Sequence, residues 1–237
     1  MSHSPFLGEF IGTMLLIIMG DGVVANVVLN KTKGNNSGWI VITFGWAMAV
    51  FLGVYASNTL GGSGHLNPAV TIAMTALNDF DSSLLLTYIA AQFSGAVAGA
   101  IVVWLAYKQH FDETTDGDAK LAVFSTGPAI RNVFHNLLTE IIGTFILVFG
   151  AMAMSKPASA LGTLDALPVA LLVLGIGLSL GGPTGYAINP ARDLGPRIAH
   201  FILPIKNKRD SDWGYSWIPV IGPIAGALIA VYLFNLI

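Results

Sequence analysis

The stretch "SGHLNPAVT" at residues 63–71 has a counterpart in "GYAINPARD" at residues 185–193. Asn is a favoured helix N-cap, and Pro is favoured at the first helical position because the N–H that it lacks would have no partner there. Each Asn-Pro-Ala copy therefore predicts the start of a helix. The apolar pieces that follow, "NPAVTIAMTAL" from Asn67 and "NPARDLGPRIAHFIL" from Asn189, are too short to cross a membrane alone.

The composition is that of a membrane protein. Of the 237 residues, 54% are hydrophobic and 10% are charged, with a mean hydropathy of +0.71, whereas soluble domains carry about 25% charged residues. Long stretches have no charged residue, among them 82–107, 166–191 and 213–237. These runs are too long and uniform for barrel strands, so we expect an all-α membrane protein. A net charge of −2 without a basic block predicts no nucleic-acid partner, and the chain has no cysteine.

Six membrane-spanning helices are expected between the polar clusters of the sequence. They are predicted near residues 6–28, 39–60, 84–107, 133–154, 165–182 and 214–236. We expect a single channel domain over residues 1–237, made of two repeats at approximately 6–107 and 133–236 that a polar loop at 108–132 joins.

An internal repeat organises these spans. The first and fourth both begin Glu-x-x-Gly-Thr, "EFIGT" from Glu9 and "EIIGT" from Glu140. Each half has three crossings and one short helix, and an odd number of crossings inverts the second half, which places a site near the bilayer midplane. The Gly-rich approaches "LGGSGHL" and "LGGPTGY" predict extended backbone, which is tolerated at that depth where it lines a water-filled cavity. We expect two short helices to meet N-terminus to N-terminus around a pore.

With these residues the chain resembles the aquaporin superfamily, and within it the glycerol facilitators, or aquaglyceroporins. The resemblance runs from about Phe6 to Phe234. Asp193 directly after Arg192, then Arg197, and "IPVIGPIAG" in the last span favour the glycerol branch over the water-only branch. The resemblance implies six transmembrane helices with two re-entrant half-helices, a homotetramer with one pore per subunit, and a plasma-membrane location with both termini cytoplasmic.

The resemblance also assigns a selectivity filter of four residues. Arg192 follows the second motif, Tyr186 takes the place where glycerol facilitators usually have Phe, and Gly177 the place where water-only channels usually have a bulky His. Trp46 is the remaining wall if one residue is inserted between it and the first motif. If that insertion lies elsewhere, Ala47 takes the place of Trp46.

Three further sets of residues follow from the resemblance. The Asn-Pro-Ala (NPA) motifs are Asn67, Pro68, Ala69 and Asn189, Pro190, Ala191. The backbone carbonyls expected to line the pore are those of Gly62, Ser63, Gly64, His65, Pro183, Thr184, Gly185 and Tyr186. The expected structural supports are Glu9, Glu140 and Asp193, the two glutamates by accepting hydrogen bonds from the re-entrant loops, with a proton-transfer role as their alternative.

These residues predict a passive channel for glycerol and other small neutral solutes, with water permeability, that excludes ions and protons. Protonated lactic acid, dihydroxyacetone and urea remain alternative solutes. A proton-coupled secondary transporter is a rival, since inverted repeats occur there too. An intramembrane enzyme is a weaker one, because the spans show no paired catalytic carboxylates, Ser-His arrangement or metal cluster. We expect no cofactor and no metal, and the partners are the transported solutes and the lipid bilayer.

Two features do not fit this scheme. Asp21, in "IIMGDGVVAN", lies where a small or neutral residue is expected. We expect its carboxylate to reach headgroup water, or else to face the outer vestibule and bias which solutes enter. The Lys/Arg bias also points the wrong way. With the N-terminus inside, Lys156 alone is cytoplasmic, and the outer side carries Lys31, Lys33, Lys108, Lys120, Arg131, Lys206, Lys208 and Arg209.

Overall fold

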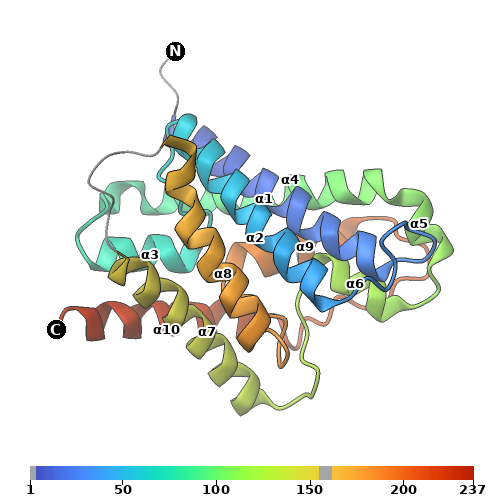
Figure 1. Ribbon diagram of the computed structural model, residues 1–237. Helices are drawn as coiled ribbons and strands as arrows, with labels where there is room; N and C mark the ends of the chain where they lie inside the picture. The colour runs from blue at the N-terminus through green and yellow to red at the C-terminus, as the bar shows by residue number, and fades with distance from the viewer. Residues whose placement is uncertain (1–3, 155–161) are drawn as a thin grey trace.

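The computed structural model describes residues 4–154 and 162–237, which are helical and contain no strand. Six long apolar helices and two half-helices are present in these residues (Figure 1). The long helices are α1 Pro5–Val28, α2 Trp39–Thr59, α4 Leu85–Ala106, α7 Val133–Ala153, α8 Leu167–Leu180 and α10 Ile218–Phe234. The half-helices are α3 Pro68–Ala76 and α9 Pro190–Ile202. The predicted fold class is therefore confirmed.

The spans differ in how they reach across the bilayer. α1, α2, α7 and the segment Ser82–Ala106 are long and apolar enough to cross by themselves. α8 has 14 helical residues, and the 3₁₀ turn Gly162–Ala166 continues it at its N-terminal end. α10, with 17 residues, begins at Ile218, which is later than the predicted start of that span at residue 214.

The stretch expected as a polar loop at 108–132 contains two short helices, α5 Lys108–Glu113 and α6 Gly117–Phe124. The side chain of Asp116 caps α6 by accepting from the N–H groups of Asp118 and Ala119. Phe111 and Phe124 stack on each other and are fully buried. Helices this short show too little hydrophobic periodicity to be predicted from sequence.

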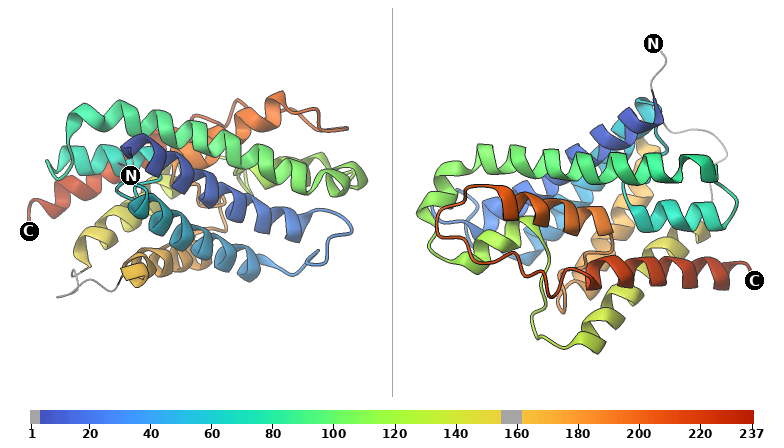
Figure 2. Two further views of the ribbon diagram at one scale, coloured as in Figure 1. Left: turned by 90° about the horizontal axis from the view of Figure 1, so that it is seen from above. Right: turned by 180° about the vertical axis from the view of Figure 1, so that it is seen from behind.

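The two halves interlock through their half-helices. Within each half the first span packs on the other two, α1 on α2 and α4, and α7 on α8 and α10. Across the halves, α9 packs on α4 and α3 packs on α10. Figures 1 and 2 show α3 and α9 entering from opposite ends and meeting in the middle of the bundle. Each half thus supplies the packing surface for the other half's re-entrant helix.

Glycines allow the first and third spans of each half to approach closely. A Cβ on Gly95 of α4 would lie 2.3 Å from the carbonyl oxygen of Phe10, and one on Gly226 of α10 would lie 2.2 Å from that of Ile141. Both obstacles are backbone atoms, which cannot swing aside. Small residues at such contacts are the usual means by which membrane helices pack.

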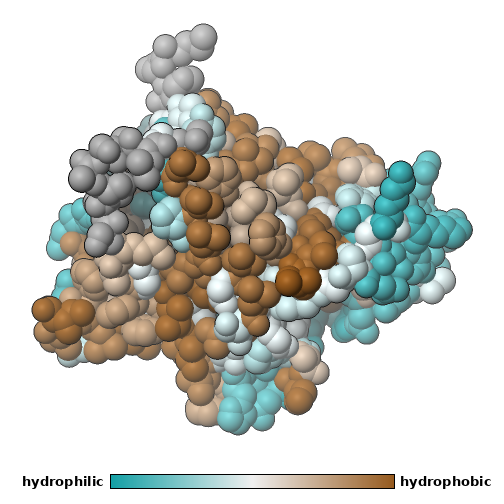
Figure 3. Space-filling model, in the orientation of Figure 1, coloured by the Kyte–Doolittle hydropathy of each residue, from teal (hydrophilic) through white to brown (hydrophobic). Residues whose placement is uncertain are grey.

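The outer surface is an apolar belt with one strongly polar end. Figure 3 shows hydrophobic residues over the helices and hydrophilic ones gathered at the end that carries α5 and α6. The first residue of α1 and the last of α10 lie at the opposite end (Figures 1 and 2). Basic side chains of the polar end pair with acids, as Lys31–Glu113, Lys108–Asp112, Arg131–Asp212 and Arg209–Asp118. Lys156 lies outside the described residues.

Gly226→Ala should destabilise the protein by about 1–3 kcal/mol, because the added methyl group overpacks the α7–α10 contact. The matched control is Gly175→Ala in α8, where an added Cβ would meet nothing within 4 Å. That control should be neutral or slightly more stable, since Ala favours helix over Gly. The measurement is the thermal midpoint of each variant in detergent, taken as the temperature at which half of the monodisperse size-exclusion peak is lost. Equal midpoints would contradict the close-packing account.

Candidate functional site

The site is built where the two half-helices begin. Asn67 caps α3 by accepting from the N–H of Ala69 at 2.9 Å. Asn189 caps α9 by accepting from Ala191 at 2.9 Å and from Arg192 at 3.2 Å. Each side-chain oxygen is therefore used by its own helix. The amide nitrogens remain as donors, beside the positive ends of two helix dipoles.

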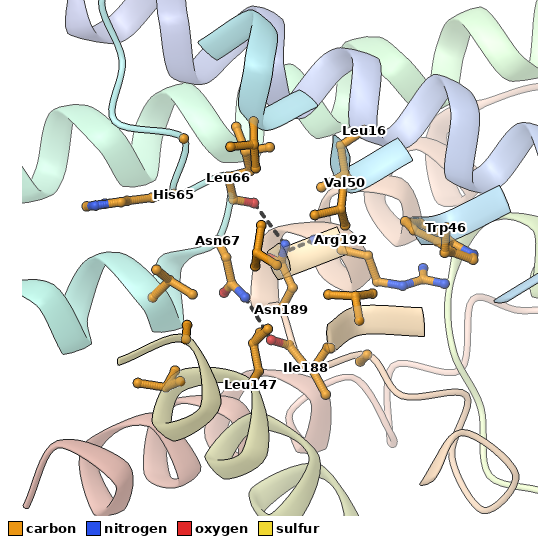
Figure 4. A pocket seen from close by; sticks show the side chains of 18 of the residues that line it. Leu16, Trp46, Val50, His65, Leu66, Asn67, Leu147, Ile188, Asn189 and Arg192 are labelled. Carbon is orange, nitrogen blue, oxygen red and sulfur yellow. Dashed lines mark hydrogen bonds between the residues drawn. The ribbon is translucent and has the colours of Figure 1, made fainter. Parts of the chain in front are cut away.

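The two motifs are bonded to each other crosswise. Asn67 Nδ2 donates to the carbonyl of Ile188, and Asn189 Nδ2 donates to the carbonyl of Leu66, both at 2.8 Å (Figure 4). Leu66 and Ile188 have φ values of 53° and 44°, in the left-handed region that such residues rarely adopt. These bonds were not anticipated from the sequence. Each amide keeps a second N–H for the pore.

Glu9 anchors the first re-entrant loop from α1. Its Oε1 accepts from the backbone N–H of His65 at 3.0 Å and from the Ser57 hydroxyl at 2.9 Å. Its Oε2 accepts from the N–H of Leu66 at 2.7 Å and from the Gln92 amide at 2.8 Å. The carboxylate is fully buried, so these four donors replace its hydration.

Glu140 does the same for the second loop from α7. Its Oε1 accepts from the Thr184 hydroxyl at 2.7 Å and from the N–H of Ala187 at 3.1 Å. Its Oε2 accepts from the N–H of Ile188 at 2.8 Å. The repeated Glu-x-x-Gly-Thr motif thus places one fully buried carboxylate behind each loop, in the arrangement that a structural support requires.

A cavity of about 120 Å³ runs past the two asparagines. One side is apolar, with side chains from α1, α2, α7 and α8: Leu16, Trp46, Val50, Val54, Leu147, Val148, Ala151, Val169 and Val173. The re-entrant segments supply the other side, which includes residues 64–67, 186–189 and Arg192. Figure 4 shows Trp46 and Arg192 at one end, His65 at the other, and the asparagines between them. The wall is mostly apolar, and its polar side chains, His65, Asn67, Asn189 and Arg192, come from the re-entrant segments.

Three of the four predicted filter side chains meet at the Trp46 end. The Arg192 guanidinium carbon lies 4.1 Å from the centre of the Trp46 ring, and Tyr186 also lines the cavity. Ala47, the alternative to Trp46, is buried and is not in the cavity wall. The sequence alone left this choice open, and the position of the indole over Arg192 favours Trp46.

Gly177 lies directly behind Tyr186. A Cβ there would be 2.9 Å from Tyr186 Cζ and 2.9 Å from Thr43 Cγ2. The Gly177 carbonyl accepts from Trp39 Nε1 at 3.0 Å, and the Trp39 ring meets Tyr186 edge-on. A side chain at this position would displace the Tyr186 ring or Thr43, and with the ring one part of the cavity wall.

The predicted pore-lining carbonyl segments differ from the segments that line the cavity. Among the residues that the structure describes, Gly64, His65 and Tyr186 belong to the lining, whereas the other five predicted positions, Gly62, Ser63, Pro183, Thr184 and Gly185, do not. The lining continues instead to Leu66, Ala187 and Ile188. Contacts behind the pore hold the upstream residues: the Pro183 carbonyl accepts from Ala129 at 2.9 Å, and Thr184 donates to Glu140.

Asp193 and Arg197 fix the helix turn that carries Arg192. Both are fully buried, and Arg197 Nε donates to Asp193 Oδ1 at 2.9 Å. Asp193 Oδ2 also accepts from the N–H and hydroxyl of Thr126, at 2.8 and 2.7 Å. Arg197 Nη1 donates to the Ser211 carbonyl at 2.7 Å. This network ties the base of the filter to the loops on both sides of it.

Asp21 does not reach headgroup water, and that expectation was wrong. It is fully buried, and its Oδ1 lies 3.9 Å from Arg192 Nη1. The acid therefore has a buried basic partner, which the sequence did not reveal because the two residues lie in different halves of the chain.

Six crossings around two opposed half-helices, with a narrow cavity between them, define a multi-pass membrane channel rather than an enzyme. Consistent with this class, the chain belongs to the major intrinsic protein family, whose sequence model matches residues 2–234.

Relatives of known description are similar to this chain over nearly its full length. The chain is 59% identical to a "Probable glycerol uptake facilitator protein" of Thermotoga maritima, over 98% of both chains. It is 53% identical to "Glycerol uptake facilitator protein 3" of Lactiplantibacillus plantarum, over 98% of this chain and 95% of that protein. The crystal structure of the aquaglyceroporin from Plasmodium falciparum matches with a TM-score of 0.83 at 31% identity, over 98% of this chain and 94% of that one.

Glu140→Gln should lower stability by about 2 kcal/mol or more, because the new NH₂ group faces donors that the carboxylate now accepts from. The loop should loosen and solute flux per folded protein should fall. The same change at the exposed Glu113, which pairs with Lys31 in solvent, is the control and should have little effect. Thermal midpoints and vesicle flux measure both. A Glu140→Gln protein as stable and conductive as the control would contradict the anchoring role.

Proposed function

We propose that this chain is a passive channel for glycerol and related small neutral solutes, and that water also passes. The observation that carries the proposal is the two-sided passage at Trp46, Tyr186 and Arg192. Glycerol has hydroxyl groups along one edge and C–H groups along the other. A passage with donors and carbonyls on one wall and aromatic and aliphatic side chains opposite is complementary to that molecule.

Each filter residue has a defined part in this proposal. Arg192 offers N–H donors that never lose their charge. Tyr186 lines the same cavity as Arg192 and Trp46, and its ring supplies a second aromatic surface for the carbon edge. Trp46 supplies a flat wall for the carbon edge, and Gly177 leaves Tyr186 room to lie flat. Further in, carbonyls of the re-entrant loops accept weakly at several points, which favours conduction over retention.

Ion exclusion follows from the charges along the same passage. Two half-helix N-termini, each equivalent to roughly +0.5 charge, meet at the asparagines. Arg192 adds a positive charge at the filter. Half-helix dipoles and a filter arginine are means of excluding protons and cations. Anions are excluded by the loss of their hydration shells in a passage this narrow.

The contacts of Glu9 and Glu140 favour this channel over a proton-coupled transporter. Both carboxylates accept hydrogen bonds from the backbone that shapes the pore, so a change of protonation would disrupt the loops themselves. We therefore assign them to structural support, and Asp193 with them. The NPA motifs are assigned to the midpoint of the solute path.

Location and assembly are part of the same proposal. We place the protein in the plasma membrane with both termini cytoplasmic, which requires the chain ends to share one side, as the helix ends do. The basic residues at the opposite end are largely engaged in ion pairs and caps. In keeping with its resemblance to the aquaporins, the chain is assigned a homotetramer with one pore per subunit.

The central test is stopped-flow light scattering on proteoliposomes with glycerol, dihydroxyacetone, urea, lactic acid at low pH, and water. Glycerol should cross far faster than in protein-free vesicles, with no proton current. A sizeable current, or glycerol uptake driven by a proton gradient, would favour the coupled transporter. If the flux of lactic acid, dihydroxyacetone or urea exceeds that of glycerol, the assigned solute changes and the passive mechanism stays.

Gly177→His should reduce glycerol flux by about tenfold or more and water flux much less, because the imidazole forces Tyr186 into the passage. Gly175→His is the matched control, since its Cβ meets nothing within 4 Å, and it should leave both fluxes near the native values. Trp46→Ala should change the ranking of solutes by removing the aromatic wall that faces the carbon edge of glycerol.

If the Gly177→His variant keeps the native ratio of glycerol flux to water flux, the assignment of this position to the selectivity filter is wrong.

A further inference from the structure

Beside Arg192 lies a buried acid, Asp21, that the proposed conduction path does not use. Asp21 is fully buried in α1, and its Oδ1 faces Arg192 Nη1 at 3.9 Å. Within the described part of the chain, neither Asp21 oxygen nor Arg192 Nη1 has a hydrogen-bond partner. Asp21 is not in the cavity wall, whereas Arg192 is. The carboxylate can therefore act on a solute only through the arginine.

The shape of α1 makes this approach possible. A Cβ on Gly20 would lie 2.2–2.5 Å from three carbons of the Trp46 ring, so the indole rests on bare helix backbone. The next residue is Asp21. The Arg192 guanidinium therefore has the Trp46 face on one side, at 4.1 Å from the ring centre, and the Asp21 carboxylate nearby.

The remaining charges nearby leave this pairing intact. Asp193, the acid next to Arg192 in the chain, is engaged by both Arg197 and Thr126. It therefore has its own cation and holds the α9 backbone, not the Arg192 side chain. Glu9 and Glu140 are engaged by the loops. A buried carboxylate without hydrogen bonds is costly unless a cation offsets it, and Arg192 is the cation in reach.

We propose that Asp21 is a specificity-determining residue that acts through Arg192. It draws the guanidinium toward α1 and offsets part of its charge, so that the filter is wider and its field weaker than Arg192 alone would make it. The buried position of Nη1, the nitrogen nearest Asp21, is the geometry that this retraction requires. Larger polyols benefit most, because they need the width, and water benefits least. The inference rests on the proposed polyol channel.

The test compares water, glycerol and a four-carbon polyol in vesicles carrying the native chain or Asp21→Asn. Asparagine keeps the shape and removes the charge, so Arg192 should extend into the passage. Flux should fall with increasing solute size, with water within about twofold of native and the four-carbon polyol down by about tenfold. Gly22→Ala, one residue away with nothing within 4 Å of its Cβ, is the control and should keep the native ratios.

A double-mutant comparison separates positioning from a merely structural role. In an Arg192→Ala background, Asp21→Asn should cause no further change in the ratio of polyol to water flux, since the residue through which it acts is gone. Should Asp21→Asn fail to fold, Asp21→Val, which leaves no polar atom to bury, should give the same size-dependent loss. Native solute ratios in the folded Asp21 variant, or an equal change in the Arg192→Ala background, would overturn the inference. If the native chain itself conducts no glycerol, the proposed function fails instead.

Discussion

The structure depends on satisfying the backbone of two non-helical segments at membrane depth. Water is scarce there, and each unpaired N–H or C=O group costs several kcal/mol. Glu9 and Glu140 meet this constraint by accepting from consecutive backbone N–H groups ahead of each NPA motif. With the N–H groups held behind the loops, other groups of the same backbone face the passage. The supports and the solute path are therefore two sides of the same segments.

The proposed filter is a composite of separate parts of the chain, each held by its own contacts. α2 supplies Trp46, the second loop supplies Tyr186, and α9 supplies Arg192. α1 adds bare backbone under the indole and a carboxylate beside the arginine. In the proposed channel, selectivity therefore comes from packing as much as from the side chains of Trp46, Tyr186 and Arg192 that line the cavity.

The sequence predicted best what local chemistry decides. Both half-helices start after Asn67 and Asn189, because N-capping and proline at the first turn need no tertiary information. The spans followed from apolar length in the same way. The residues that line the cavity start a few positions after the predicted carbonyl rows. In the second loop, Glu140 and Ala129 hold the upstream residues Thr184 and Pro183 from outside the motif. The partner of Asp21 could not be predicted, since no local pattern records which face of α1 lies toward Arg192. The Asn-Pro-Ala repeat also gave no indication that each asparagine amide donates to the backbone carbonyl ahead of the other motif.

The exchange of half-helices between the repeats has a consequence for biosynthesis. α3 is made early but packs on α10, the most C-terminal helix that the structure describes. The Leu66 carbonyl likewise gains its partner, the Asn189 amide, only after the second half has been made. Since chains emerge from their N-terminal end first, the first three spans must be held in the bilayer with an unfinished re-entrant segment between them. A chain truncated before α10 should therefore leave α3 without its packing surface, so that quality control detects the defect in the N-terminal half, far from the missing residues.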